Sequence, residues 1–571
     1  LPGMIGLLGQ GPDPDNGLLS FRLLSERIGG SHWYLAMLRD SRAAARSLCH
    51  VLSTARWTTE RLAERPESIA WLDDAGGLIA RDPAALRSEV RSLLRRRALV
   101  ADDESDLERQ AVEAVHAVMG VRTRELVRAA LADSLDGVDP ERTARILTDA
   151  TDAVLDGVLS LATGMVVASR DGARAVESGL RGDGTWSGAL ARHAVIAMGR
   201  FGGAEITYAS DADVLFVHEA RPGADRREAA DEAEAVARLV VRLLSRAQPH
   251  SLEVDADLRP EGRRGPMSRS PGSYADYYER WSSVWERQAL LRARACAGDA
   301  GLGRAFEELV ELLRWSPGGL DDDGLREIRR LKARMEAERL PRGTTPARHL
   351  KLGPGGLSDV EWAAQVLQLR HAARVPGLRT TSTLAALDAA RSAGLLGASE
   401  TDDLRSAWLL ASRVRAANVL GTGRDHGTRV EVLPEGQREI RLVGRLLGMP
   451  PGRERDLEDL YRRRARHARR IVERVVFGRI CEPRPDPAGP APRAGGDVGS
   501  GTPEPPRDRP GDDRASSTAE ERRTGATGED ETAGHRAGAS RSRPASAPAR
   551  SVPRPSRRAP ARRGGGPYPW S

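Results

Sequence analysis

The stretch of residues 194–219, AVIAMGRFGGAEITYASDADVLFVHE, decides the fold class of this chain. Its first five residues, 194–198, are apolar and predict a short buried strand. Three glycines end that run before a helix is established: Gly199, Gly202 and Gly203. A second apolar run at 214–217 predicts that the chain extends again. The stretch is therefore expected to fold as two strands joined by a glycine turn.

Two carboxylates, Asp211 and Asp213, lie at the entrance of the second predicted strand. Side chains alternate across a strand, so positions two apart project to the same side, and two like charges held there favour a cation. A third acidic strand is expected at 251–260, SLEVDADLRP, where Asp255 and Asp257 share one face. Three carboxylates from two strands, beside a bare backbone turn, suit a two-magnesium nucleotidyl-transfer site. The alternative is that the first pair belongs to a solvated loop.

The charge of the chain lies partly in its tail. The formal net charge is +7 over 571 residues, but residues 479–571 hold 17 of the 88 basic and 12 of the 81 acidic residues. This leaves 71 basic and 69 acidic residues in 1–478, a nearly neutral part that gives no reason to expect a specific nucleic-acid partner. The tail is rich in Pro, Arg and Gly and is predicted to be disordered, because it cannot bury enough apolar surface.

Three cysteines occur far apart and in no metal-like spacing: Cys49, Cys296 and Cys481. Together with the absence of an export signal and of a run of about eighteen apolar residues, this predicts a cytoplasmic protein with no membrane partner. The chain begins at Leu1 rather than Met, and is expected to be a fragment of a longer protein.

Helical periodicity surrounds the predicted sheet and gives an α+β, mostly helical fold class with a small mixed sheet. We expect four regions: a helical lead-in at 1–170, a catalytic nucleotidyltransferase-type domain at 171–300, a C-terminal helical bundle at 301–478, and the disordered tail at 479–571. No chemistry is assigned to the lead-in. The expected helices are 83–97, 106–118, 122–133, 140–167, 225–248, 274–295, 360–374, 382–396, 401–420 and 438–477.

A second glycine-rich segment lies at 350–362, LKLGPGGLSDVEW. Lysine is almost absent from this arginine-rich chain, since only Lys332 and Lys351 occur. A compact ammonium beside Gly353, Gly355 and Gly356 could reach a phosphate, with the glycine amides and the following helix N-terminus as further donors. A plain helix-entry loop is the alternative. Arg259, just past the third acid, could also meet a triphosphate or could be one more surface arginine.

Together these residues resemble the glutamine synthetase adenylyltransferases. The resemblance rests on MGRFGGAEITYASDADVLFVHE, on EVDADLRPEGRRGP with WERQALLRARACAGD, and on LKLGPGGLSDVEWAAQVLQLRH, and it covers residues 18–478 but not the tail. Members of that family have two catalytic halves. The N-terminal half removes AMP from glutamine synthetase by phosphorolysis, and the C-terminal half attaches AMP to glutamine synthetase. The chain resembles the attaching half, with the removing half expected upstream.

The resemblance implies transfer of AMP from ATP to a tyrosine hydroxyl of glutamine synthetase, with release of pyrophosphate and lower nitrogen assimilation. It implies Mg²⁺ as cofactor, glutamine synthetase and ATP as partners, and control by glutamine and a PII-type signal protein. The catalytic, metal-binding positions fall on Asp211, Asp213 and Asp255, although Asp257 stands where many relatives have Arg and leaves the third ligand open. The nucleotide-binding positions are Gly199, Gly202, Gly203, Ser210, Arg259, Lys351, Gly353, Gly355 and Gly356.

Three other functions stay open at this point. The same motifs suit the reverse reaction, phosphorolytic removal of AMP. A nucleotidyltransferase of the same fold could act on RNA or on small hydroxyl compounds, although the near-neutral folded part argues against RNA. A regulatory module could sense ATP without catalysis, against which the presence of all three acids counts.

Overall fold

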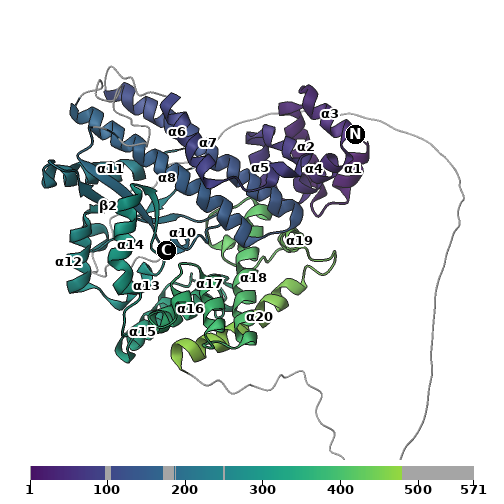
Figure 1. The fold of residues 1–571 in the computed structure, drawn as a ribbon. Coiled ribbons are helices and arrows are strands. Elements are labelled where there is room, and N and C mark those ends of the chain that lie inside the picture. Colours follow the sequence, from purple (N-terminus) through teal and green to yellow (C-terminus); the bar gives the residue numbers. More distant parts are fainter. Residues whose placement is uncertain (1, 97–103, 172–185, 187, 248–250, 479–571) are drawn as a thin grey trace, which may run out of the picture. The chain divides into compact units, whose positions relative to one another are not determined.

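The computed structural model describes residues 2–96, 104–171, 186, 188–247 and 251–478, and the predicted tail lies outside them. The described residues belong to one compact unit that spans Leu1–Glu482 (Figure 1). Inside this unit the fold is mostly helical with one small mixed sheet, as the sequence predicted. The predicted boundaries at 170 and 300 stay predictions, because the elements on either side of them pack into the same unit.

The lead-in begins with short helices around a common apolar core. Asp13 caps the second of them by accepting a hydrogen bond from the backbone amide of Asn16. Leu48 and Leu52, one helical turn apart, are fully buried in that core. The elements are α1 Pro2–Gly9, α2 Pro14–Ile28, α3 His32–Asp40, α4 Arg42–Thr54, α5 Arg56–Glu64, the 3₁₀ turns Pro66–Leu72 and Ala75–Leu78, and α6 Pro83–Arg96.

Two long helices, α7 Glu104–Asp136 and α8 Pro140–Asp171, complete the lead-in and pack against each other. The sequence predicted two helices where α7 is continuous, because Gly120 interrupts the pattern. That glycine makes room for a neighbour: Arg65 donates to the carbonyl oxygen of Gly120 at 2.8 Å, and a methyl group on residue 120 would lie 2.7 Å from the same guanidinium.

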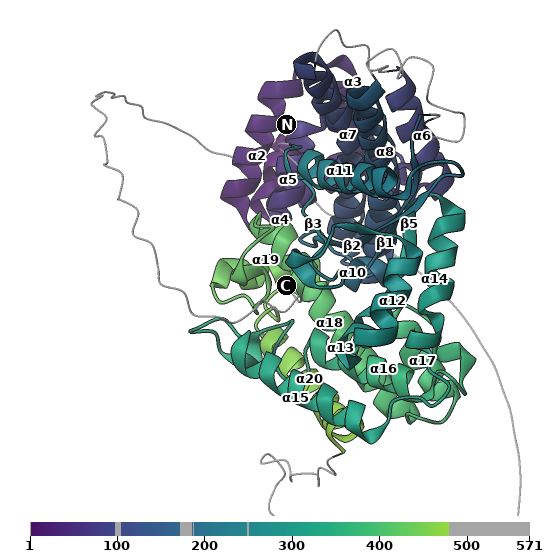
Figure 2. The same ribbon diagram turned by 90° about the vertical axis from the view of Figure 1, so that its left-hand side faces the viewer.

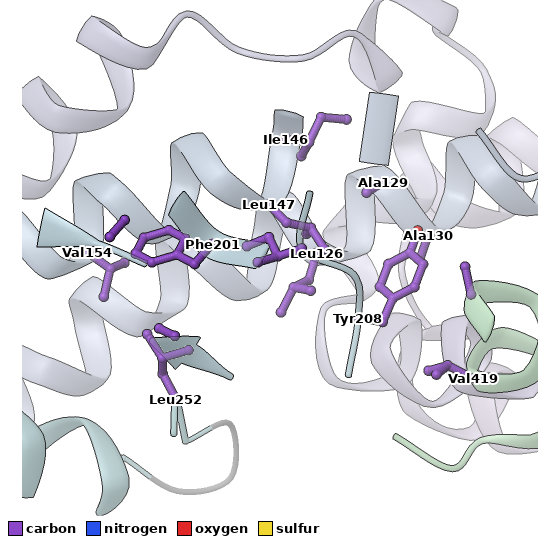
Figure 3. Close-up of a cluster of buried hydrophobic side chains, with 14 of the residues drawn as sticks. Leu126, Ala129, Ala130, Ile146, Leu147, Val154, Phe201, Tyr208, Leu252 and Val419 are labelled. Carbon is purple, nitrogen blue, oxygen red and sulfur yellow. The ribbon is translucent and has the colours of Figure 1, made fainter. Parts of the chain in front are cut away.

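By length and composition α8 could also cross a membrane, but 83% of its most apolar 18-residue window is buried inside the structure. It packs against α6, α7 and α11 and against the edge of the sheet. These contacts are those of a core helix. Leu126 of α7 and Leu147 of α8 share a buried apolar cluster with Phe201, Tyr208 and Leu252 (Figure 3).

The sheet has the order β3-β2-β1-β5, with β4 paired to β2. Strand β1 pairs antiparallel with β2 and with β5, whereas β3 and β4 both run parallel to β2. The predicted order of strand, strand, helix and strand is confirmed, but the segment between the first two strands, predicted as a glycine turn without helix, contains one helical turn at Gly199–Gly202. The elements are β1 Ala191–Ala197, α10 Gly199–Gly202, β2 Ala212–Ala220, α11 Arg226–Ser245, β3 Val254–Asp255, the 3₁₀ turn Gly262–Arg264, β4 Ser268–Arg269, α12 Pro271–Trp281, α13 Val284–Leu290, β5 Arg294–Gly298 and α14 Ala300–Arg314.

Both faces of the sheet are covered, which explains why β1 is apolar without alternation. Val195 and Ala197 belong to the large core that includes α8 and α11, while Ala194 and Ile196 belong to a second core with Tyr274 of α12. Figure 2 shows α11 on one side of the strands and α12 and α14 on the other.

Two predictions around the third acidic strand were wrong. The expected strand at 251–260 contains only Val254–Asp255 in the sheet, because the Asp255 carboxylate accepts the backbone amide of Asp257 at 2.6 Å and turns the chain. The expected helix at 274–295 is two shorter helices, and its end forms part of β5. That strand, RACAG, lacks the β-branched and aromatic residues by which strands are recognised.

The C-terminal helices close the unit. The predicted helix at 438–477 is two helices, separated by the turn around Pro450 and Pro451. Contacts of α4 with α19 and of α5 with α18 join the N-terminal helices to the C-terminal helices, and α19 lies next to the N-terminal helices in Figures 1 and 2. The elements are α15 Asp322–Glu338, the 3₁₀ turns Pro346–Arg348, Pro376–Leu378 and Thr428–Val430, α16 Leu357–His371, α17 Thr383–Ser392, α18 Ala398–Thr422, α19 Gln437–Leu446 and α20 Asp456–Phe477.

Candidate functional site

Three aspartates meet where β2 begins. Asp211 immediately precedes the strand, and Asp213 is its second residue. Asp213 and Asp255 are direct partners in the parallel pairing of β2 with β3. The backbone holds this arrangement on both sides, since Met198 donates to the Asp213 carbonyl at 2.8 Å and Ala212 donates to the Glu253 carbonyl at 2.9 Å.

The carboxylates act on one another electrostatically. Burial, with Asp211 and Asp255 as neighbouring negative charges, raises the pKa of Asp213 to about 7, and Lys351 opposes this rise. Burial also raises the pKa of Asp255, and the negative charges of Asp257 and Asp211 add to this rise. Negative charges held together in this way are stabilised by a cation.

Gly199 lies directly against Asp213. Its φ of +53° is in the left-handed region that favours glycine, and a methyl group there would lie 2.0 Å from the Asp213 Oδ2 atom. The turn therefore needs glycine at this position, for its backbone conformation and for the carboxylate that it touches.

A cavity of about 700 Å³ opens in front of Asp211 and Asp213. This volume is in the range of small-molecule sites. Gly199, Ser210 and Lys351 also line it, so the structure brings five of the predicted site residues to one cavity. The Ser210 hydroxyl accepts the backbone amide of Thr207 at 2.9 Å, which holds the turn before Asp211.

The other predicted nucleotide contacts are not among the residues that line the cavity. A methyl group on Gly202 would lie 1.8 Å from the carbonyl oxygen of Arg292, and one on Gly203 would lie 2.1 Å from the Arg292 guanidinium. Arg259 donates to the carbonyl oxygens of Ala256 at 2.8 Å and Gly265 at 3.2 Å. These residues pack the loops behind the site, and direct contact with a nucleotide stays a prediction for them.

The glycine loop before α16 has a similar role. Gly355 has a φ of +73°, and a methyl group there would lie 1.8 Å from the carbonyl oxygen of Ala465 in α20. Gly353 and Gly356 likewise face backbone carbonyls rather than the cavity. Their close packing holds the loop that carries Lys351 against the C-terminal helices.

The side chain of Asp359 also holds the glycine loop before α16 in place. Its buried carboxylate accepts the Gly355 amide at 2.7 Å and the Arg469 guanidinium at 2.9 Å, and it also accepts Lys332. Among the described lysines, Lys332 is thus a buried structural residue and Lys351 lines the cavity.

The side chains around Asp255 and Asp257 indicate which of the two is the third carboxylate of the site. Asp257 accepts Arg263 at 2.5 Å and Arg259 at 3.5 Å, so its charge is already paired. Among the described residues no arginine forms an ion pair with Asp255 within 4.0 Å, although the charge of Arg263 lowers the pKa of Asp255, and Asp255 stands next to Asp213 in the sheet. The geometry favours Asp255.

These residues fit a magnesium ion that is shared with a phosphate ligand. Within the described ranges no three His, Cys, Asp or Glu side chains are already grouped as ligands of one metal. Mg²⁺ usually keeps several waters and is held by one or two carboxylates plus substrate phosphates. Asp211 and Asp213, whose charges repel each other at the cavity wall, are the donors that such an ion requires.

Sequence reasoning missed the contribution of the lead-in. Trp57 and Arg61 of α5 and Arg122 and Leu126 of α7 line the same cavity as the aspartates. The surface pattern of these helices gave no signal, because an arginine on an amphipathic helix is ordinarily solvated. The C-terminal region also contributes to the wall, with Leu352, Ser358, Glu361, Trp362, Gln365, Arg415, Asp425, His426 and Glu431.

Buried polar contacts fasten the sheet to the C-terminal helices beside the cavity. Arg292 pairs with Glu205 at 2.8 Å, and Glu205 also accepts the backbone amide of Thr383 at the start of α17. Gln288 donates to Gln365 at 2.7 Å. The wall that carries Lys351 is therefore held in a fixed position relative to β2.

Comparisons with known proteins show which families this chain is similar to. Residues 45–309 match the family model described as glutamate-ammonia ligase adenylyltransferase, and residues 326–476 match the model described as PII-uridylyltransferase. The chain is 49% identical over 484 residues to the bifunctional glutamine synthetase adenylyltransferase/adenylyl-removing enzyme of Streptomyces coelicolor, and 47% identical over 486 residues to that of Streptomyces avermitilis. Each match covers 84% of this chain and 46% of the relative, so the chain spans about half the length of these relatives.

Proposed function

Because the chain belongs to the glutamine synthetase adenylyltransferase family, we propose that it transfers AMP from ATP to a tyrosine hydroxyl of glutamine synthetase, releases pyrophosphate, and so lowers nitrogen assimilation. The observation that carries the proposal is the placement of Asp211 and Asp213 in one cavity with Gly199 and Lys351, next to Asp255. The relatives' names include two activities, and the chain spans about half of their length. We assign it the attaching reaction because it resembles the C-terminal, attaching half of the family.

The proposed reaction is a displacement at the α-phosphorus of ATP. The tyrosine oxygen forms a bond to that phosphorus, the bond to the β-phosphate oxygen breaks, and pyrophosphate leaves. Asp211 and Asp213 would hold magnesium, with Asp255 beside them. Magnesium, when bound, supplies charge neutralisation on the phosphates and lowers the pKa of the attacking hydroxyl.

The chain's own residues orient and stabilise the reacting groups. Lys351 places its ammonium near Asp213 in the cavity, where it is close enough to act on the charge of the leaving pyrophosphate. Gly199 leaves the Asp213 carboxylate accessible. Asp255 is the proposed acceptor of the tyrosine proton, since burial and neighbouring acids raise its pKa and make it a better base.

Removal of AMP by phosphorolysis is the second candidate, favoured by the adenylyl-removing activity in the names of both Streptomyces relatives. In that reaction an oxygen of inorganic phosphate forms a bond to the phosphorus of the tyrosine-bound AMP, the bond from that phosphorus to the tyrosine oxygen breaks, and the products are ADP and the free tyrosine hydroxyl. Incubation of adenylylated glutamine synthetase with phosphate alone separates the two candidates, because only the removing reaction releases ADP.

The proposal includes a cytoplasmic location and control by glutamine and a PII-type signal protein. The match of residues 326–476 to a PII-uridylyltransferase model supports a relation between the helices after the sheet and nucleotidyltransferases of nitrogen signalling.

The test is transfer of labelled AMP from ATP to purified glutamine synthetase in the presence of magnesium. We expect label on a tyrosine with the chain, and none with Asp213→Asn. Asp257→Asn is the matched control, because that carboxylate belongs to the same acidic segment but is paired with Arg263, and it should retain transfer. A folded Asp213→Asn variant with normal turnover would refute the metal site, and binding of ATP with no turnover in the wild type would favour a sensing module.

A further inference from the structure

Arg122 is a buried cation at the cavity wall. It lies on α7, only 6% of its surface is exposed, and it lines the same cavity as Asp211 and Asp213. Its Nε atom donates to the Thr151 hydroxyl of α8 at 3.2 Å, and that hydroxyl donates to the Leu147 carbonyl at 2.7 Å. The guanidinium is thus held through one nitrogen. Within the described ranges its two terminal nitrogens have no hydrogen-bonded protein partner.

Four of the other five arginines that line this cavity form ion pairs with carboxylates. Arg61 pairs with Glu64 at 3.0 Å, Arg200 with Glu361 at 3.1 Å, Arg292 with Glu205 at 2.8 Å, and Arg415 with Glu431. No carboxylate of the described chain lies within 4.0 Å of Arg122. Glu125, the nearest acid on the same helix, forms ion pairs with Arg124 and Arg128.

Such an unpaired buried charge is costly. Burial lowers the pKa of Arg122 to about 10, and no opposite charge counteracts this effect, yet the group is still charged near neutral pH. A buried ion without a partner typically costs several kcal/mol, whereas an anionic ligand would offset that cost on binding. A guanidinium with two free terminal nitrogens is suited to a planar or bidentate contact with phosphate oxygens.

The position of Arg122 indicates which part of a nucleotide it would meet. Arg122 lines the cavity from α7, whereas Asp211 and Asp213 line it from the start of β2. The α-phosphate must lie at the aspartates for transfer, and the anionic groups that extend away from it are the β- and γ-phosphates.

We propose that Arg122, held by Thr151, binds the β- and γ-phosphates of ATP and the pyrophosphate that leaves, so that the helical lead-in is part of the nucleotide site. This inference rests on the proposed function for the identity of the ligand. It assigns a binding role to a region in which the sequence indicated none.

The experiment measures binding of three probes in the presence of magnesium, namely ATP, pyrophosphate and AMP, by calorimetric titration of the whole chain. For Arg122→Gln we expect dissociation constants for ATP and pyrophosphate that rise about 10- to 100-fold, the range for a lost charged hydrogen bond, and an unchanged constant for AMP. Thr151→Val, which keeps the charge but frees the guanidinium, should show a smaller rise for the same two probes.

Arg124→Gln is the matched control. It lies on the same helix outside the cavity and pairs with Glu89 at 2.7 Å, so its loss should lower the melting temperature and leave all three affinities unchanged. Arg122→Gln should show the opposite pattern, with an equal or higher melting temperature without ligand, because an unpaired buried charge is removed. Arg122→Lys keeps the charge and serves as the second variant if the glutamine variant does not fold.

Wild-type affinity of Arg122→Gln for pyrophosphate, or an equal loss of affinity for AMP, would overturn the inference. Loss of pyrophosphate binding in a chain that does not modify glutamine synthetase would leave the inference standing and refute the proposed function. A wild-type chain that binds neither ATP nor pyrophosphate would refute both.

Discussion

Replacement of Gly199 by alanine tests the geometry of the site most directly. Two effects are expected. The left-handed φ of +53° costs about 1–2 kcal/mol for a residue with a Cβ atom. In addition, the methyl group would lie 2.0 Å from Asp213 Oδ2, so the carboxylate must move by more than 1 Å to reach ordinary contact. A displacement of that size in a catalytic group costs about 100-fold in rate.

Gly223→Ala separates the two effects. Gly223 has a φ of +85° in the loop after β2, and an added methyl group there meets nothing within 4 Å. Both variants should lose similar stability, measured by urea unfolding, but only Gly199→Ala should lose AMP transfer to glutamine synthetase, by about 100-fold in kcat. Normal turnover in Gly199→Ala, or an equal loss in Gly223→Ala, would refute the placement of Asp213 against this turn.

Three further predictions concern charge. Magnesium should raise the melting temperature of the wild type at pH 8. Below pH 7 it should bind about tenfold more weakly per pH unit, because the proton competes for Asp213, whose pKa is raised to about 7. Asp213→Asn should show no response to magnesium, and a response of the wild type that does not depend on pH would contradict the role of Asp213. Arg292→Met leaves Glu205 buried without its cation and should lower the unfolding free energy by about 3–5 kcal/mol in urea titrations, whereas a loss below about 1 kcal/mol would show that the pair is unimportant. Burial lowers the pKa of His218 to about 4, below its unfolded value, so the contribution of this group to stability is complete above about pH 6.5 and falls by about 3 kcal/mol as the pH drops to 4. His218→Gln should flatten the pH dependence of unfolding in that window, and an unchanged slope would exclude His218 as its source.

Much of the fold follows from local patterns. The apolar run of β1 and the amphipathic pattern of α11 each predicted the element that the structure contains. The failures have a common cause. Strand β5 and the two-residue strands β3 and β4 exist because neighbouring strands pair with them, and such pairing leaves little trace in the residues themselves. The single helix α7 was divided in the prediction because the packing of Arg65 against Gly120 could not be foreseen.

The candidate site likewise has a part that the sequence predicted and a part that it did not. Asp211, Asp213 and the glycine turn are adjacent in sequence, so strand alternation alone placed both carboxylates together. Gly355 and Gly356 were interpreted as phosphate contacts because a glycine loop before a helix suggests them, whereas the structure uses them for close approach to backbone carbonyls. A glycine in sequence does not reveal whether a ligand or another segment of the chain approaches it.

The sequence by itself determined the family resemblance, the two strands with their paired carboxylates, and the one lysine at the cavity, since each is a property of a short contiguous segment. Only the tertiary structure decided what surrounds the aspartates. Arg122 and Trp57 of the lead-in meet Lys351 across one cavity because α5 packs against α18 and α7 packs against α5, α8 and α11, not because of any local pattern. Periodicity specifies which face of a helix is buried, but the packing of distant segments decides which cation is left without a partner.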